Sequence, residues 1–147
     1  MKKIFLILAI FSVITISCSN DDGDTQPVTQ NPVLVGKGKL SANQLFTNQN
    51  ILITNADDWQ VILAHMEQVN PGITATFAET DIDFSTWQVL AAFQVKNSST
   101  SVDISVSEND ENIIASVQNL QMGLTQDVAH PFHIIKIGKS SKPVIFE

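Results

Sequence analysis

The sequence DFSTWQVLAAFQV, residues 83–95, is the most apolar run of the chain after its N-terminal segment. It is entered through Ser85 and Thr86 and is followed by the polar residues 96–101, KNSSTS. A continuous apolar run of this length between polar turns is typical of a strand that is buried on both faces. We therefore predict a central strand at 83–95, with a helix and further strands packed against it.

One helix is predicted before this strand. Asn55 is the expected N-cap, and Asp57 and Asp58 place carboxylates near the positive end of the helix dipole. Asn70-Pro71-Gly72 ends the helical pattern. The stripe expected to pack on a sheet consists of Trp59, Ile62, Leu63, Met66 and Val69.

The remaining apolar segments are separated by short polar turns, which is typical of antiparallel strands. We expect Gly72 to Thr80 to be irregular, Gln121 to His130 to be a long loop, and the last two strands to pair with each other. The predicted fold class is α+β, with a mostly antiparallel β-sheet of about five to seven strands packed against one main α-helix. The other predicted strands are Val33–Leu40, Asn50–Thr54, Val102–Val106, Ile113–Leu120, Phe132–Ile137 and Pro143–Phe146.

The N-terminal segment has the pattern of an export signal. Lys2 and Lys3 precede an apolar run, Ile4 to Ile14, that is shorter than the ~20 residues of a membrane-spanning helix. The pair Ser17-Cys18, with the only cysteine of the chain, resembles the lipobox of bacterial lipoproteins, which implies lipid attachment at Cys18. The alternative is an ordinary signal peptide that is cleaved near Ser17. We predict a signal peptide at 1–17 and anchoring to a membrane by acyl chains.

Residues 18–32 are predicted to be a flexible acidic tether, and residues 33–147 a single α+β domain. The tether is rich in Asp, Asn, Gln, Thr and Pro, so it buries too little apolar surface to fold. Asp21, Asp22 and Asp24 resemble signals that send lipoproteins to the outer face of the Gram-negative outer membrane; the alternative is that they are ordinary solvated charges. The expected location is the outer membrane of the Gram-negative cell envelope. The sequence does not decide between its periplasmic face and its cell-surface face.

The charge of the chain excludes two kinds of partner. Once residues 1–17 are removed, six lysines, no arginine and fifteen acidic residues remain, a net charge of −9. Binding to nucleic acid needs basic groups that neutralise phosphates, so we expect no nucleic-acid partner. The same charge disfavours contact between the protein surface and anionic lipid.

The residues show no pattern of a catalytic or metal site. There is no Gly-x-Ser-x-Gly motif, and His65-Met66-Glu67 lacks the second histidine of a zinc-binding helix. His130 and His133 are close in sequence, but the sequence indicates no third ligand. Three carboxylates, on Glu79, Asp81 and Asp83, are interpreted as part of a solvated loop with one capping aspartate. We predict no cofactor, no metal and no enzymatic activity.

Three segments together resemble the C-terminal domain of the PrcB family, the protease complex subunits. They are Asp58-Trp59, Ile82-Asp83-Phe84 and PFHIIKI at 131–137, and the likeness extends from about Ile51 to Phe146. The chain departs from the family between Val95 and Val102, where it lacks the family's glycines, and it contains no tyrosine. The resemblance implies a non-catalytic lipoprotein that binds and stabilises an exported serine protease or another envelope protein.

Four residues are expected to contact a partner or ligand, namely Trp59, Trp87, Phe132 and His133. A partner could also add a strand at Gly36–Leu40 or at Val144–Phe146. Two alternatives stay open: a carrier of an apolar or glycan ligand near Trp59 and Trp87, and a hydrolase built from His65, His133 and the carboxylates near Asp83. We interpret Asp83 as the cap of the turn before the strand, and expect Phe84 to pack beside Trp59.

Overall fold

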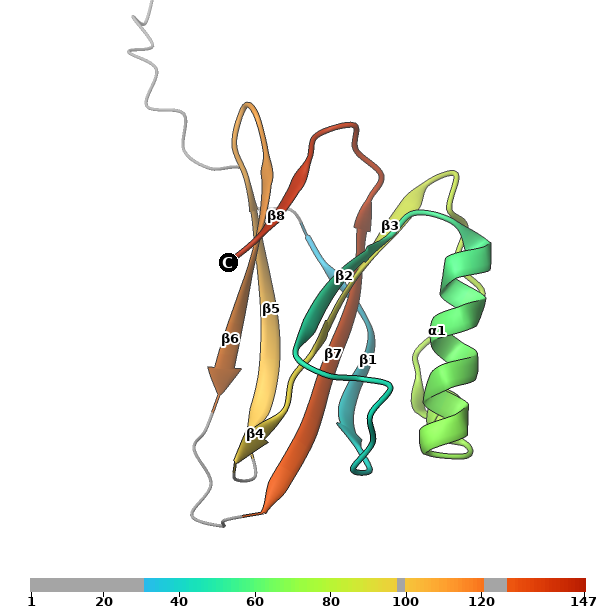
Figure 1. The fold of residues 1–147 in the computed structure, drawn as a ribbon. Coiled ribbons are helices and arrows are strands. Elements are labelled where there is room, and N and C mark those ends of the chain that lie inside the picture. The colour runs from blue at the N-terminus through green and yellow to red at the C-terminus, as the bar shows by residue number, and fades with distance from the viewer. Residues whose placement is uncertain (1–30, 98–99, 121–126) are drawn as a thin grey trace, which may run out of the picture.

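The structure is a computed structural model that describes residues 31–97, 100–120 and 127–147. The predicted signal peptide, Cys18 and nearly all of the predicted tether lie outside the described residues. Three layers make up the described domain, with one helix and two β-sheets (Figure 1). The larger sheet, here called sheet 1, lies between the helix and the smaller sheet, called sheet 2.

Sheet 1 is antiparallel and has the strand order β1-β7-β3-β2, with β4 paired to the start of β7. Its strands are β1 (Val33–Leu40), β2 (Gln49–Ile53), β3 (Trp87–Phe93), β4 (Lys96–Asn97) and β7 (Val128–Gly138). β3 lies between β2 and β7, and every residue from Gln88 to Phe93 is buried. The prediction of a central strand is therefore confirmed.

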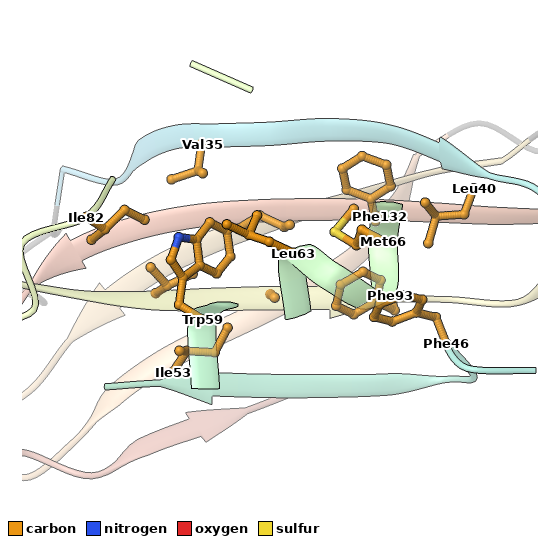
Figure 2. Packing of buried hydrophobic residues seen from close by; sticks show 13 residues of the cluster. Val35, Leu40, Phe46, Ile53, Trp59, Leu63, Met66, Ile82, Phe93 and Phe132 are labelled. Carbon is orange, nitrogen blue, oxygen red and sulfur yellow. The ribbon is translucent and has the colours of Figure 1, made fainter. Parts of the chain in front are cut away.

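The two faces of sheet 1 contribute to two different cores, because side chains alternate along a strand. Val89, Ala91 and Phe93 of β3 face the helix, whereas Leu90 and Ala92 face sheet 2. The core on the helix side also contains Trp59, Leu63 and Met66 of helix α1, which runs over Ala56–Val69 (Figure 2). The continuous apolar sequence of β3 is thus explained by burial on both faces.

Helix α1 begins and ends as its sequence predicts. The Oδ1 atom of Asn55 accepts a 2.9 Å hydrogen bond from the N–H of Asp58, which satisfies one of the free donors of the first turn. After Val69 the chain turns through Gly72, which has a φ of +84°, into a short 3-10 helix, η1 (Ile73–Thr76). No helix among the described residues is long and apolar enough to cross a membrane.

Sheet 2 consists of β5 (Ser101–Glu108), β6 (Ile113–Leu120) and β8 (Val144–Phe146). β5 and β6 form the predicted antiparallel hairpin. β8, however, pairs parallel to β6, so the prediction that the last strand pairs with the strand around Phe132–Ile137 is wrong. Val144 and Phe146 pack against the core between the sheets, and this burial accounts for the placement of β8 in sheet 2.

The predicted fold class, α+β with mostly antiparallel strands and one main helix, is confirmed. Eight strands occur among the described residues, more than the expected five to seven, and they form two sheets. β7 also begins at Val128, so Val128 to His130 belong to a strand and not to the predicted loop. Its pairing partner changes from β3 to β4 beside Pro131, whose carbonyl accepts a 3.0 Å hydrogen bond from Gln94 N–H.

Candidate functional site

Two of the four predicted contact residues lie inside the core on the helix side. Trp59 has 1% of its surface exposed and Phe132 has none. The indole N–H of Trp59 donates a 2.8 Å hydrogen bond to the carbonyl of Thr80, so its polar atom is used within the fold. Figure 2 shows both side chains between α1 and sheet 1, where they stabilise the fold and are screened from a partner.

Trp87 is half-buried at the start of β3 and is the third predicted contact residue. The ammonium group of Lys136 lies 4.5 Å from the centroid of its ring, and the same group lies 2.5 Å from Oε1 of Glu79. A cation over an indole face is attracted by the ring quadrupole. Trp87 therefore already has a cation as its neighbour, and a ligand at this face would have to displace Lys136.

His133 lies on the opposite face of sheet 1, towards sheet 2. It pairs across the sheet with Ala92, a member of the core between the sheets, whereas Phe132 faces the helix. Its Nδ1 lies 2.8 Å from the backbone nitrogen of Ile104 and 2.8 Å from Oδ1 of Asp103, both on β5. The four predicted contact residues therefore do not form one site.

Asp103 also lies 3.1 Å from the ammonium group of Lys37 on β1, so a cluster of Lys37, Asp103 and His133 joins three strands. Burial lowers the pKa of the His133 imidazole below its ordinary range. The Asp103 carboxylate raises this pKa, and the Lys37 ammonium lowers it further. The net effect is a lowered pKa of His133, so the neutral imidazole is favoured.

The residues of the alternative hydrolase site, and the two histidines His130 and His133, are separated in the structure. His65 is exposed on α1 and packs edge-on to Phe46, whereas His133 lies between the sheets. His130 pairs with Leu40, which belongs to the helix-side core, so His130 and His133 lie on opposite faces of β7. No group of three or more His, Cys, Asp or Glu residues that could hold a metal ion occurs in the described part of the chain.

Asp83 caps the turn that leads into β3, as predicted. Its carboxylate accepts hydrogen bonds of 2.9 Å from Ser85 N–H, 2.5 Å from Ser85 Oγ and 2.9 Å from Thr86 Oγ1. The Ser85 hydroxyl makes the largest contribution to lowering the pKa of Asp83, because it stabilises the ionised form. Phe84 packs against the same core as Trp59, as expected. These interactions give the segment Asp83-Phe84 a structural role.

The unpaired edges of the two sheets are the remaining candidate surface. The two strands predicted to offer an edge, β1 and β8, are both edge strands. β1 is protected by a bulge between Leu34 and Gly36, by the hydrogen bond from Ala78 N–H to Val35 O, and by the ring of Phe77 over Gly36. β8 is only three residues long. Both edges therefore resist the addition of another strand.

The other two edges differ from each other. On β5, the backbone N–H of Ile104 is bonded to His133, and Asp103 places a carboxylate beside it. On β2, the sequence QNILI has no charge, no proline and no bulge in its register with β3. Leu52 is 39% exposed on this strand. Among the described residues, β3 is the one strand paired with β2, so the outer side of β2 has a free edge.

Comparison with protein-family models, curated proteins and solved structures finds no match to this chain. The site is therefore defined by the fold alone. Sequence reasoning did not foresee the cluster of Lys37, Asp103 and His133, because its members come from three strands whose pairing a local pattern does not fix. It also missed β2 as the open edge, although the lack of charge in QNILI was a readable signal.

Proposed function

We propose that the protein is a non-catalytic lipoprotein of the Gram-negative cell envelope, anchored through acylated Cys18, that binds an extended segment of an exported protein at the edge of β2. The resemblance to the PrcB family makes an exported serine protease the first partner to test. The observation that supports β2 as the binding surface is that β2 lacks the features by which the other edge strands oppose pairing with a further strand.

Each of those strands has a feature that opposes strand addition, namely the bulge and lysines of β1, the occupied amide of β5 and the shortness of β8. β2 has five residues in regular register with β3 and none of these features. An added strand would satisfy the outward N–H and C=O groups of β2, which gives affinity without a deep pocket.

The side chains beside this edge indicate what kind of segment fits. Ile51 of β2 and Ile62 of α1 are partly buried against the helix-side core, and Leu52 is exposed on the opposite face of the sheet. Apolar residues alternating with polar ones would extend both apolar surfaces. Because the mature chain carries a net charge of −9, a neutral or basic segment is favoured over an acidic one.

Site-specific photo-crosslinking in intact cells tests this proposal. A photoreactive residue replaces Leu52, and in a matched control it replaces Ile145, an apolar residue of β8 with a similar exposure of 43%. We expect an adduct with an exported protein from position 52 only, mapped to an extended segment of that protein. Leu52→Lys should abolish a complex that Ile145→Lys leaves intact.

Adducts that form equally from both positions, or a complex that tolerates Leu52→Lys, would rule out β2 as the binding edge. An adduct between two copies of this chain would show that β2 mediates self-association and does not bind an exported partner. A carrier of small ligands is not favoured, because Trp59 is buried and its N–H is already bonded to Thr80.

A further inference from the structure

The Nδ1 atom of His133 has two neighbours that make opposite demands on it. The N–H of Ile104, at 2.8 Å, needs a lone pair on Nδ1, whereas the Asp103 carboxylate oxygen, also at 2.8 Å, needs a proton there. One nitrogen cannot satisfy both neighbours at the same time. The protonation state of His133 therefore decides which residue of β5 it binds.

Charged groups approach His133 from several strands. Asp103 of β5 and Lys37 of β1 form a 3.1 Å ion pair next to His133. Lys37 is also the residue of β1 that lies directly opposite His133 of β7. Lys39 of β1 lies opposite Pro131 and Lys96 of β4 opposite Ala129, both further along the same face of β7. β3 contributes the uncharged Ala92. Asp103 is thus the one carboxylate near His133 among the described residues, and the other charged groups are lysines.

We propose that His133 is a pH-sensitive latch between the two sheets, whose Nδ1 accepts the Ile104 amide of β5 when the imidazole is neutral and donates to the Asp103 carboxylate when it is protonated. In the neutral state, Nδ1 accepts the N–H of Ile104 and the ring proton is on Nε2, while Asp103 is paired with Lys37. In the protonated state, Nδ1–H is donated to Asp103, and the N–H of Ile104 loses its acceptor. The latch belongs to the fold itself and does not depend on the proposed partner.

Burial sets the pH range of this change. The imidazole side chain is only 8% exposed, and desolvation lowers its pKa more than Asp103 raises it. A histidine with a lowered pKa in the folded state stabilises the fold above its ordinary pKa of ~6.5. That stabilisation declines as the pH falls from ~6.5 towards the lower pKa of the folded state. Acidification should therefore release the latch.

The release exposes a protected edge. Because the Ile104 amide is bonded to His133, the edge of β5 that does not pair with β6 is closed to another strand at neutral pH. When Nδ1 carries a proton it can no longer accept, so this amide becomes an unpaired donor on an edge strand. The second consequence is a weaker connection between β5 and β7, the strands that join sheet 2 to sheet 1.

Nuclear magnetic resonance of the purified full-length chain tests the latch directly. We expect His133 to titrate with a midpoint below ~6.5, and to be the Nε2–H tautomer at neutral pH. The Ile104 amide shift should follow the same titration, and its protection from hydrogen exchange should decrease over the same range. Asp103→Asn should lower the His133 midpoint further, and Lys37→Met should raise it.

A non-titrating acceptor provides the matched variant. His133→Gln can accept the Ile104 amide at every pH, so that amide should stay protected where it becomes exposed in the wild type. His65→Gln, at an exposed histidine of α1, should leave the Ile104 titration unchanged. A His133 midpoint at or above ~6.5, or an Ile104 amide that does not respond to it, overturns the proposal. Both readouts come from the wild-type chain and do not depend on the folding of any variant.

Discussion

The ammonium group of Lys136 lies 4.5 Å from the ring centroid of Trp87 and forms a 2.5 Å ion pair with Glu79. These three residues come from β7, from β3 and from the segment between η1 and β3. The Lys136 side chain is 11% exposed and that of Glu79 is 31% exposed, so the lysine is largely screened from water while the carboxylate is partly solvated. Lys136 therefore ties the segment between η1 and β3 to the two central strands of sheet 1.

Replacement of Lys136 by methionine should lower the free energy of unfolding by about 1–2 kcal/mol, because the cation–ring attraction and the charged hydrogen bond are both lost. Methionine keeps an unbranched apolar stem, which limits the change in packing. Urea denaturation measures the difference. Lys39→Met, at an exposed lysine of β1, is the control; an equal change in both variants would remove the special role of Lys136.

A side chain at Gly36 should destabilise the fold. An added Cβ would lie 2.6 Å from Cδ1 and 3.1 Å from Cγ of Phe77, so the whole ring would have to move. Overpacking of this kind costs about 1–3 kcal/mol. Gly36→Ala should thus lower the denaturation midpoint, whereas Gly138→Ala, where nothing lies within 4 Å of the added Cβ, should have a smaller effect.

The Gly36→Ala variant also has a specific rescue. Phe77→Leu removes ring atoms that the new methyl group meets, so the double variant should recover part of the loss caused by Gly36→Ala. Strict additivity of the two single changes would show that the destabilisation has a cause other than this contact.

The carboxylates of Glu67, which is half-buried, and of Asp83, which is exposed, should make the stability of the fold depend on pH in the acid range. Hydrogen bonds from the Thr74 hydroxyl and from the N–H groups of Gly72 and Thr74 lower the pKa of Glu67, and the Ser85 hydroxyl does so for Asp83. Carboxylates with lowered pKa values stabilise the fold above their ordinary pKa of about 4, and this stabilisation is lost as the pH falls through the pKa of the folded state.

Melting temperatures measured from pH 7 down to about pH 2 test whether protonation of Glu67 and Asp83 lowers the stability of the fold. Glu67→Gln and Asp83→Asn should each flatten the decline below about pH 4. Glu111→Gln, in the exposed turn after β5, changes the charge equally without removing such hydrogen bonds and should leave the shape of the decline unchanged. A decline that persists unaltered in both variants would contradict these assignments.

Lipid attachment at Cys18 remains a prediction and has a simple test. Cys18→Ala should move the protein from the membrane fraction to the soluble fraction, because acyl chains are the expected anchor. Protease treatment of intact cells then separates the two faces of the outer membrane. A protein that stays with the membrane after Cys18→Ala would show that another interaction holds it there.

Local sequence patterns predicted the parts of the fold that depend on local physics. Residues close together in the sequence were enough to predict four features. These are the cap at Asn55, the helix that ends at Val69, the buried strand at Trp87–Phe93 and the β5–β6 hairpin. The parallel pairing of β8 with β6 was missed, because the choice between two sheets depends on which core buries Val144 and Phe146.

The same limit applies to function. Trp59 and Phe132 have large aromatic side chains that suit binding surfaces and cores equally well, and only the packing shows that they belong to the core. The partners of His133 were not predictable, because they depend on how two sheets approach each other. The open edge of β2 likewise becomes visible only when the strand order is known.

The position of β7 has a consequence for the order of folding. β1 and β3 do not pair with each other, and both pair with β7, which comes after β5 and β6 in the chain. Sheet 1 must therefore wait until this late segment of the chain is available, and contacts so distant in sequence make folding slow. Until β7 is in place, the apolar β3 lacks one of the two strands that flank it, and exposed apolar surface of this kind favours aggregation.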